Sequence, residues 1–472
     1  MKVKLRRIVI LAILLISVIS AILIGANLLK PKPKYNLILI SVDTLRADHM
    51  GVYGYPKNTT PNIDKWAKNA TVFTNAYTIF PLTFQSFYTL FTGTDEVLKN
   101  DSLGYSSSVT EITQASSPTL PQILQKAGFK TAAFVTNPVL DPLATNTFKN
   151  GFNTFNRYDV TGLSEGINRE NSGELFLKIF NYDYDNSKKI TSDAISWLAK
   201  NKDYRFFAWL HYTNPHQPYI PPQDVACRFN KSLCDKEYFQ ELSTSGIPRC
   251  TEGEKILEGE DLTAKMALYD AEIASLDEYI GKVFKQISDL GLDKNSIIVF
   301  YGDHGESFEH GIMSHGYSLY NTDVKIPLIV RYPEVTPGKK SQLIDNTDIL
   351  PTLLSVLGVR FDRNKLTGED FANVLTSGVK KGKKEVFFMT PRDFTNKYGV
   401  TNGESKYIFS KGVYCVPREG KEELYNIGED KQEIKSIFKS SNTPLKDSLF
   451  KYFDLKGDER DEEIDKLKSI GY

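Results

Sequence analysis

Apolar runs that end abruptly in polar residues are the main pattern along this chain. The run at 35–42 (YNLILISV) ends at Asp43, and the run at 296–301 (SIIVFY) is followed closely by Asp303. Short runs rich in apolar and β-branched residues are typical of buried strands. We therefore predict that both aspartates lie at the carboxyl ends of strands, where ligands bind in open α/β sheets.

Helix signals alternate with these strands. Thr60 and Pro61 suit the start of a helix, because proline is tolerated in the first turn. Residues 76–93 predict a loop that turns into a short helix, with Thr83 near its start and Gly93 past its end. Residues 262–290 predict a helix that leads into the strand at 296. The alternation from residue 35 to about residue 359 predicts an α/β core.

Five of the six histidines fall in two short windows, HYTNPHQP (residues 211–218) and GDHGESFEHGIMSHG (residues 302–316). Adjacent carboxylate and imidazole, as in Asp303 and His304, suit a divalent cation. For this pair alone a solvated surface turn is the alternative. Two parallel strands, however, aim Asp43 and Asp303 at one cation. His211 lies inside the strand-like run FFAWLH, so a buried imidazole with a structural role is the alternative for it.

The order and spacing of four motifs give the chain a family resemblance. VDTLRADHMGVYGY, PLTFQSFYTLFTG, PHQP and GDHGE together resemble the sulfatase family of the alkaline phosphatase superfamily. The likeness covers nearly everything after the N-terminal apolar segment. It implies an alkaline-phosphatase-like α/β/α sandwich (36–378, with an insertion at about 221–259) and a smaller C-terminal α+β subdomain (379–472).

The resemblance also assigns residues to roles. It implies a site for a divalent metal (zinc, manganese, calcium or magnesium) and leaves room for a second metal. Thr44 stands where many sulfatases have another aspartate, and one carboxylate fewer favours zinc or manganese over calcium. The implied metal ligands are Asp43, Thr83, Asp303 and His304; the implied catalytic residues are Thr83, His216 and His315; and the implied substrate-binding residues are His211, His216 and His315.

The nucleophile segment departs from the sulfatase pattern. Many sulfatases mature a cysteine or serine in C/S-x-P-x-R to formylglycine, whereas residues 83–87 read TFQSF. Threonine there resembles the superfamily's phosphodiesterases and its phosphoethanolamine and phosphoglycerol transferases. We therefore expect phosphoester hydrolysis or transfer through a covalent Thr83 intermediate. A sulfuric ester hydrolase acting on glycans is the alternative. The second alternative is that this chain binds metal but is catalytically silent, because other family members have histidine or arginine where Phe87 stands.

The first residues predict a membrane anchor. Residues 1–7 are basic, residues 8–29 are mostly apolar, and residues 30–35 form a Lys-Pro linker. Within them, the nineteen residues 8–26 would reach about 28 Å as a helix, close to the bilayer core of about 30 Å. A cleaved signal peptide is the alternative. We expect a single-pass protein of the cell membrane with its catalytic domain outside, acting on an anionic ester substrate such as an envelope lipid or a glycan.

Composition limits the remaining possibilities. Lys plus Arg and Asp plus Glu both number 58, so the net charge of zero does not indicate a nucleic-acid partner. Three of the four cysteines cluster, at Cys227, Cys234 and Cys250, and Cys415 lies far downstream. Four cysteines allow three disulfide connectivities. Zinc binding and simple buried thiols are the alternatives.

Overall fold

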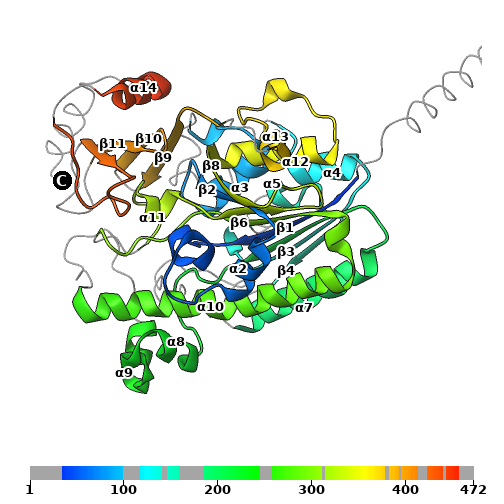
Figure 1. Cartoon of the computed structure of the whole chain (residues 1–472), viewed down its shortest axis with the longest axis horizontal. Coiled ribbons are helices and arrows are strands. Elements are labelled where there is room, and N and C mark those ends of the chain that lie inside the picture. The colour runs from blue at the N-terminus through cyan, green and yellow to red at the C-terminus, as the bar shows by residue number, and fades with distance from the viewer. Residues whose placement is uncertain are drawn as a thin grey trace, which may run out of the picture.

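Two β-sheets organise the computed structural model, a large mixed sheet and a small antiparallel one (Figure 1). The residues that the structure describes are 34–98, 117–140, 146–158, 184–244, 258–310, 314–377, 382–392, 395–412, 422–439 and 443–455. Within them the large sheet has eight strands in the order β4-β3-β5-β1-β6-β7-β2-β8. The strands are β1 (Asn36–Val42), β2 (Thr71–Tyr77), β3 (Lys130–Val135), β4 (Thr154–Arg157), β5 (Phe206–Tyr212), β6 (Ser296–Gly302), β7 (Leu328–Arg331) and β8 (Gly338–Asp345).

The three central strands bring their carboxyl ends to one edge. β1 pairs in parallel with β5 on one side and with β6 on the other. Ser41 lies opposite His211, and Val42 lies opposite Gly302. All residues of these strands are buried, as expected for a parallel sheet covered on both faces. The predicted strands at 35–42, 206–211 and 296–301 are thus confirmed.

Helices cover both faces of the large sheet, which confirms the predicted α/β core (Figure 1). One face carries α2 (Pro61–Ala67), α7 (Tyr184–Asn201) and α10 (Gly259–Asp289), and the other carries α3 (Thr83–Thr92), α4 (Leu120–Lys126), α5 (Asn146–Lys149), α12 (Ile349–Leu357) and α13 (Ala372–Ser377). The predicted helix at 262–290 is α10. Gly93 ends α3 at a φ of 66°, a left-handed conformation that glycine adopts without a Cβ penalty.

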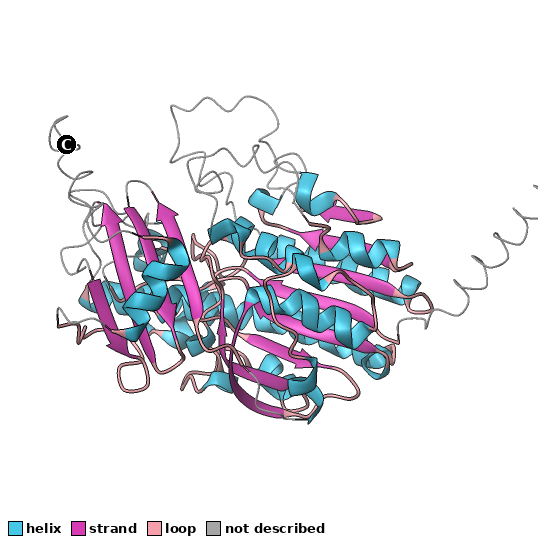
Figure 2. Ribbon diagram, turned by 90° about the horizontal axis from the view of Figure 1, so that it is seen from above, coloured by secondary structure: helices cyan, strands magenta, loops and turns pink. Residues whose placement is uncertain are grey.

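The small sheet lies at one end of the large one (Figure 2). Its strands run in the order β12-β11-β10-β9, all antiparallel, and α14 packs on them, with the rings of Phe450 and Phe409 5.0 Å apart. Bounds are β9 (Val386–Arg392), β10 (Thr395–Thr401), β11 (Ser405–Gly412), β12 (Glu422–Asn426) and α14 (Pro444–Phe453). The predicted C-terminal subdomain therefore contains a sheet and a helix, while its predicted start at residue 379 lies outside the described residues.

The predicted insertion at 221–259 is helical where the structure describes it. It holds α8 (Gln223–Phe229) and α9 (Lys236–Thr244), both in contact with α10. A disulfide joins Cys227 to Cys234 inside this segment. Cys250 and Cys415 lie outside the described residues.

Across the described ranges, no helix has the length and apolarity to cross a membrane. The predicted anchor at 8–29 lies outside those ranges, so it stays a prediction.

One side chain on α10 fixes the start of α2. The buried Asp277 carboxylate accepts hydrogen bonds from the backbone N–H groups of Asn62 and Ile63, each at 2.9 Å. Both groups belong to the first turn of a helix, which has no acceptor within the helix itself. Asp277 therefore joins α2 to α10 and holds the segment that follows Asp43 against the sheet.

We predict that Asp277→Ala lowers the free energy of unfolding by about 1–3 kcal/mol, because it leaves the buried Ile63 N–H and the part-buried Asn62 N–H without this acceptor. Glu278→Ala, at the exposed neighbouring position of the same helix, serves as the control and should change stability by less than about 0.5 kcal/mol. Urea unfolding of the two variants measures both values. Equal stability of the two variants would show that the hydrogen bonds from the first turn of α2 to Asp277 contribute nothing to stability.

Candidate active site

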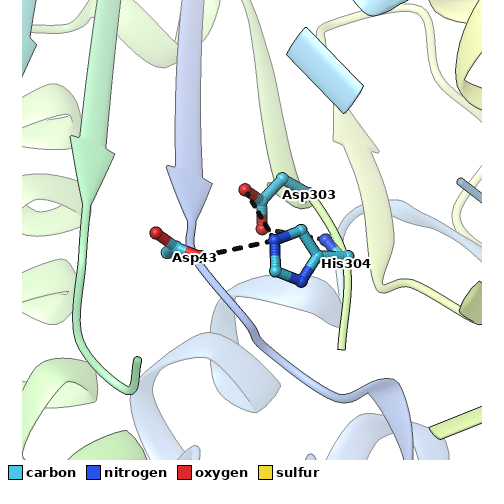
Figure 3. Close-up of side chains that lie close together, drawn as sticks. All are labelled: Asp43, Asp303 and His304. Carbon is cyan, nitrogen blue, oxygen red and sulfur yellow. Dashed lines mark hydrogen bonds and ion pairs between the residues drawn. The ribbon is translucent and has the colours of Figure 1, made fainter. Parts of the chain in front are cut away.

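Three buried side chains meet at the carboxyl ends of β1 and β6 (Figure 3). Asp43 follows β1, while Asp303 and His304 follow β6. The Nε2 atom of His304 lies 3.6 Å from Asp43 Oδ1 and 3.7 Å from Asp303 Oδ2. One ligand atom from each of the three residues lies within 4.8 Å of the others. The sequence prediction that two strands deliver carboxylates to one point is thus matched by the fold.

Backbone groups hold Asp303 in one orientation. Its Oδ1 accepts hydrogen bonds from the backbone N–H of Thr44 at 3.1 Å and of His304 at 2.8 Å. Its Oδ2 is buried and has no hydrogen-bond partner among the described residues. Thr44 adopts a φ of 52°, which is rare for a β-branched residue and marks strain of the kind found at functional sites. In this conformation the backbone N–H of Thr44 donates to Asp303.

His304 presents a lone pair to the two carboxylates. Its Nδ1 lies 2.9 Å from the Gly305 carbonyl oxygen, so Nδ1 carries the proton and donates. The Nε2 atom of this tautomer is an acceptor, as metal ligation requires. Glycine is needed at 305, since a Cβ there would lie 1.8 Å from the Thr322 carbonyl oxygen.

The electrostatics of this cluster suit a divalent cation. Burial and the neighbouring Asp303 raise the pKa of Asp43 to about 6, and burial raises the pKa of Asp303 to about 8. Two carboxylates in a low dielectric repel each other and resist ionisation, whereas a dication between them offsets both charges. The orphaned Asp303 Oδ2 and the His304 lone pair supply the oxygen and nitrogen donors. This mixed donor set fits zinc or manganese better than calcium, which prefers six to eight oxygens.

Thr83 is the first residue of α3, and its side chain lies next to the cluster of Asp43, Asp303 and His304. Its hydroxyl lies 3.2 Å from His304 Nε2 and 3.5 Å from Asp43 Oδ1, and the residue is only 6% exposed. Ser86 on the same helix donates to the Asp303 carbonyl oxygen at 2.8 Å, which ties α3 to the end of β6. The free amides at the start of a helix attract anions. Thr83 is therefore placed where an anionic ester can meet the cluster.

His216 and His315 border the same space. Their ring centroids are 5.0 Å apart, and His315 lies 4.5 Å from the ring of His304. His216 Nδ1 lies 2.6 Å from the Gln217 carbonyl oxygen, and His315 Nδ1 lies 3.1 Å from a carboxylate oxygen of the fully buried Glu306. Nδ1 of each ring is therefore engaged within the protein. Their predicted catalytic roles are compatible with this placement and stay predictions.

A buried arginine links the two loops that carry the Asp43, Asp303 and His304 cluster. The guanidinium of Arg46 binds both oxygens of Glu309 at 2.9 Å and both oxygens of Asp48 at 2.9 and 2.7 Å. Burial works to raise the pKa of Glu309, but the Arg46 charge outweighs it and holds that pKa low. Tyr269 on α10 adds a bridge, because its hydroxyl donates to the Thr44 carbonyl oxygen at 2.6 Å.

His211 lies behind the cluster, not on its open side. The residue is fully buried, and its Nε2 is 4.0 Å from Asp43 Oδ2. The predicted contact between His211 and substrate gains no support from this position. The remaining histidines are in structural surroundings: His49 pairs with Asp270 at 2.7 Å, and His310 stacks on Tyr320 with ring centroids 3.8 Å apart.

Sequence reasoning missed three residues that the structure brings to the site: Asn137, Glu306 and Arg46. Asn137 donates a hydrogen bond to Asp43 Oδ2. Asn137 follows the end of β3, and polar residues at the carboxyl ends of parallel strands converge on one edge of the sheet. This pattern could have identified Asn137 from the sequence. Glu306 lies inside the GDHGE motif, but nothing in the motif shows that it contacts His315. Arg46 is next to the Asp43 turn, and its partner Glu309 is too distant in sequence to be inferred.

Family models match most of the chain. The sulfatase model matches residues 35–359, and a model described as N-sulphoglucosamine sulphohydrolase, C-terminal, matches residues 308–454. Among curated proteins, the chain is 25% identical over 389 residues to an ulvan-active sulfatase of Formosa agariphila. This alignment covers 77% of this chain and 70% of the relative. It is 24% identical over 464 residues to an arylsulfatase of Clostridium perfringens, and this alignment covers 86% of this chain and 91% of the relative.

Solved structures share the fold. A structure in complex with its substrate D-glucosamine-2-N,6-O-disulfate matches with a TM-score of 0.66 at 20% identity and covers 89% of this chain and 97% of that one. The phosphonate monoester hydrolase of Agrobacterium radiobacter matches with a TM-score of 0.63 at 18% identity, and the match covers 89% of this chain and 94% of that one. At these identities the likeness establishes the architecture and leaves the reaction open.

We predict that the stabilisation given by added Mn²⁺ or Zn²⁺ grows with pH. The raised pKa values of Asp43 and Asp303 mean that the metal-free folded state binds protons more tightly than the unfolded state. These groups therefore stabilise the metal-free protein fully below about pH 4, and this stability is lost as pH rises toward about 8. A cation must displace the same protons, so it binds better at high pH.

The measurement is the cation-induced rise in Tm at pH 5.5, 7.0 and 8.5. The rise should be smallest at pH 5.5 and largest at pH 8.5, and Asp303→Asn should remove most of it. A rise that is equal at all three pH values, or that survives in the variant, would place the cation elsewhere.

Proposed function

Because the chain belongs to the sulfatase family of the alkaline phosphatase superfamily, we propose that it is a metal-dependent hydrolase or transferase of phosphate esters that works through a covalent Thr83 intermediate. The observation that carries this proposal is the position of the Thr83 hydroxyl, at the start of α3 and 3.2 Å from His304 Nε2. Membership of the sulfatase family supports hydrolysis, and the hydroxyl of Thr83 supports direct attack by that group without a formylglycine.

The side chain of Thr83 argues against an aldehyde nucleophile. Formylglycine is an aldehyde made from a cysteine or serine, whose Cβ carries two hydrogens. Threonine carries a methyl group on Cβ, so its oxidation gives a ketone. The hydroxyl is therefore the group available for attack, and an alcohol needs activation to act at neutral pH.

A cation held by Asp43, Asp303 and His304 would supply that activation, by lowering the pKa of the Thr83 hydroxyl and offsetting the charge of the ester. In the proposed first step, Thr83 Oγ1 loses its proton to solvent and forms a bond to phosphorus. The bond to the leaving oxygen breaks, and that oxygen takes a proton from His315 or His216. In the second step, water or an acceptor hydroxyl gives its proton to that histidine and forms a bond to phosphorus, while the bond from phosphorus to Thr83 Oγ1 breaks and Oγ1 takes a proton from solvent.

The sulfate ester remains the second candidate, and the comparisons favour it. Relatives of this chain include an ulvan-active sulfatase and an endo-4-O-sulfatase of Bacteroides thetaiotaomicron, the latter 23% identical over 377 residues. A phosphodiester and a sulfate monoester each carry one negative charge at neutral pH, so charge alone does not separate them. The fold neighbour that hydrolyses phosphonate monoesters supports phosphorus chemistry on this architecture.

A silent metal-binding relative is the third candidate, and it depends on Phe87. Phe87 is fully buried against Trp209, with ring centroids 4.9 Å apart. An aromatic side chain in this position cannot bind the ester, so the positive charge on the substrate side must come from the cation, the histidines and the start of α3. The start of α3 is at Thr83, and the residues that would hold the cation, Asp43 and His304, lie within 3.5 Å of its hydroxyl, which favours an active enzyme.

We predict that Thr83→Ala lowers kcat for an aryl phosphodiester by at least about 10³-fold, because the covalent step is lost. Thr83→Ser keeps the hydroxyl and should retain activity within about 30-fold. Both variants should bind Mn²⁺ or Zn²⁺. Assays with an aryl phosphodiester and an aryl sulfate, with and without EDTA, measure the preference. Turnover by Thr83→Ala close to wild type would exclude the nucleophile role, and a preference for the aryl sulfate would favour the second candidate.

We also propose that residues 8–29 anchor the protein in the cell membrane with the catalytic domain outside. Lys34 lies two residues before Asn36, the end of β1 that is opposite the site, and β1 spans about 23 Å at about 3.3 Å per residue. The predicted linker of residues 30–35 is short, so the amino ends of the strands would face the bilayer. The site would then open away from it, which favours a glycan, polymer or soluble ester over a lipid of the same bilayer.

We expect the full-length chain in the membrane fraction of cells and a chain starting at residue 34 in the soluble fraction, with equal kcat/KM for a small soluble ester. Protease added to intact cells should degrade the domain of the full-length chain. A full-length chain that is soluble, or a domain that the protease cannot reach, contradicts this topology.

A further inference from the structure

A chain of polar contacts behind the site ends at Asp43. The indole N–H of Trp209 donates to Ser41 Oγ at 2.9 Å, and Ser41 Oγ lies 3.0 Å from His211 Nδ1. The other ring nitrogen of His211, Nε2, faces Asp43 Oδ2 at 4.0 Å. All four residues are fully buried. Nε2 of His211 has no hydrogen-bond partner among the described residues, and its 4.0 Å distance from Asp43 Oδ2 is too long for a hydrogen bond.

The contacts of Ser41 favour one tautomer of His211. Because Ser41 Oγ already accepts the Trp209 proton, its single hydroxyl proton can go to His211 Nδ1 at 3.0 Å or to the Leu210 carbonyl oxygen at 3.3 Å. The nearer acceptor is Nδ1. In that arrangement Nε2 carries the proton and turns a donor toward the Asp43 carboxylate. The opposite tautomer would place a lone pair against a negative oxygen, which is unfavourable in a low dielectric.

Aromatic packing fixes the plane of the ring. Phe87 meets His211 edge to face, with centroids 4.9 Å apart and an interplanar angle of 82°. The indole of Trp209 lies 6.0 Å from the same ring. An imidazole held this way has little freedom to rotate, so its Nε2 stays directed at Asp43. Phe87, at a position where a charged or imidazole side chain is expected from the resemblance, thus has a structural contact with the group behind Asp43.

We infer that His211 is a positioning residue: Asn137 binds Asp43 Oδ2 by a hydrogen bond, the nearby Nε2–H of His211 attracts the same oxygen electrostatically, and Asp43 Oδ1 is thereby left to face the cation site. Asn137 donates to the same oxygen from the end of β3. Asp43 Oδ1 is the atom that lies 3.5 Å from Thr83 Oγ1 and 3.6 Å from His304 Nε2. Partners of this kind fix the orientation of ligands, and their loss typically costs 10–100-fold, roughly, in metal affinity.

The competing interpretation is that His211 only fills space. An apolar ring of the same shape would then serve equally well, and affinity for the cation would not depend on a donor at Nε2. The two interpretations differ in what a substitution does to metal binding, not in what it does to packing. The inference rests on the cation site of the proposed function and is independent of which ester the enzyme cleaves.

Three substitutions of His211 separate these cases in the full-length chain. His211→Phe keeps the aromatic shape and removes both nitrogens. His211→Gln can place an amide N–H near the position of Nε2, whereas His211→Asn places it near Nδ1, too short to reach Asp43. Calorimetric titration of the EDTA-treated protein with Mn²⁺ measures affinity without substrate or turnover, and Tm in EDTA reports the fold.

The expected result is a loss of affinity of about 10–100-fold in His211→Phe and His211→Asn, with His211→Gln within about threefold of wild type. Ser41→Ala, which removes the partner of Nδ1, should lose less affinity than His211→Asn. If His211→Phe does not fold, the comparison of His211→Asn with His211→Gln decides. Equal affinity in these two variants and wild type overturns the positioning role alone. A wild-type chain that binds no Mn²⁺ or Zn²⁺ overturns the cation site, and with it the role of His211.

Discussion

Two carboxylates buried side by side are the constraint on which the rest of this site depends. Asp43 and Asp303 are fully buried at the ends of adjacent parallel strands, and the pairing of β1 with β6 fixes their separation. Burying like charges together is unfavourable unless a cation or protons offset them. The strained Thr44, the lone pair of His304 and the Arg46 clamp all become understandable as parts that hold a cation-binding geometry.

This constraint also bears on Thr83, the proposed nucleophile, which is placed by a helix. α3 begins at Thr83, and the contact from Ser86 to the Asp303 carbonyl ties that helix to the strand that delivers Asp303. A direct contact thus joins the helix that carries the Thr83 hydroxyl to the strand end that carries the proposed ligand Asp303. Rigid placement of reacting groups is a large part of catalysis in phosphoryl transfer, where the protein contributes mainly position and charge. His216 and His315 close the other side from two separate loops.

The sequence was sufficient for the parts that depend on local pattern. The runs before Asp43 and Asp303 predicted strands, the strand ends predicted a shared site, and Pro61 and Gly93 marked helix ends that the structure confirms. The remainder depends on contacts between distant segments, which no local pattern contains. Arg46 with Glu309 and Glu306 with His315 are of this kind. The orientation of His211 could not be predicted either, because a strand-like run does not show which neighbour a ring nitrogen meets.

The central claim is that Thr83 forms a covalent bond to the substrate. Rapid acid quenching during turnover of an aryl phosphodiester, followed by peptide mass spectrometry, tests it most directly. A phosphoryl adduct on the peptide that contains Thr83, absent after EDTA treatment and absent in Thr83→Ala, is the predicted result. Turnover without any adduct at Thr83 in the wild-type enzyme, or an adduct at another residue that persists in Thr83→Ala, would contradict the claim.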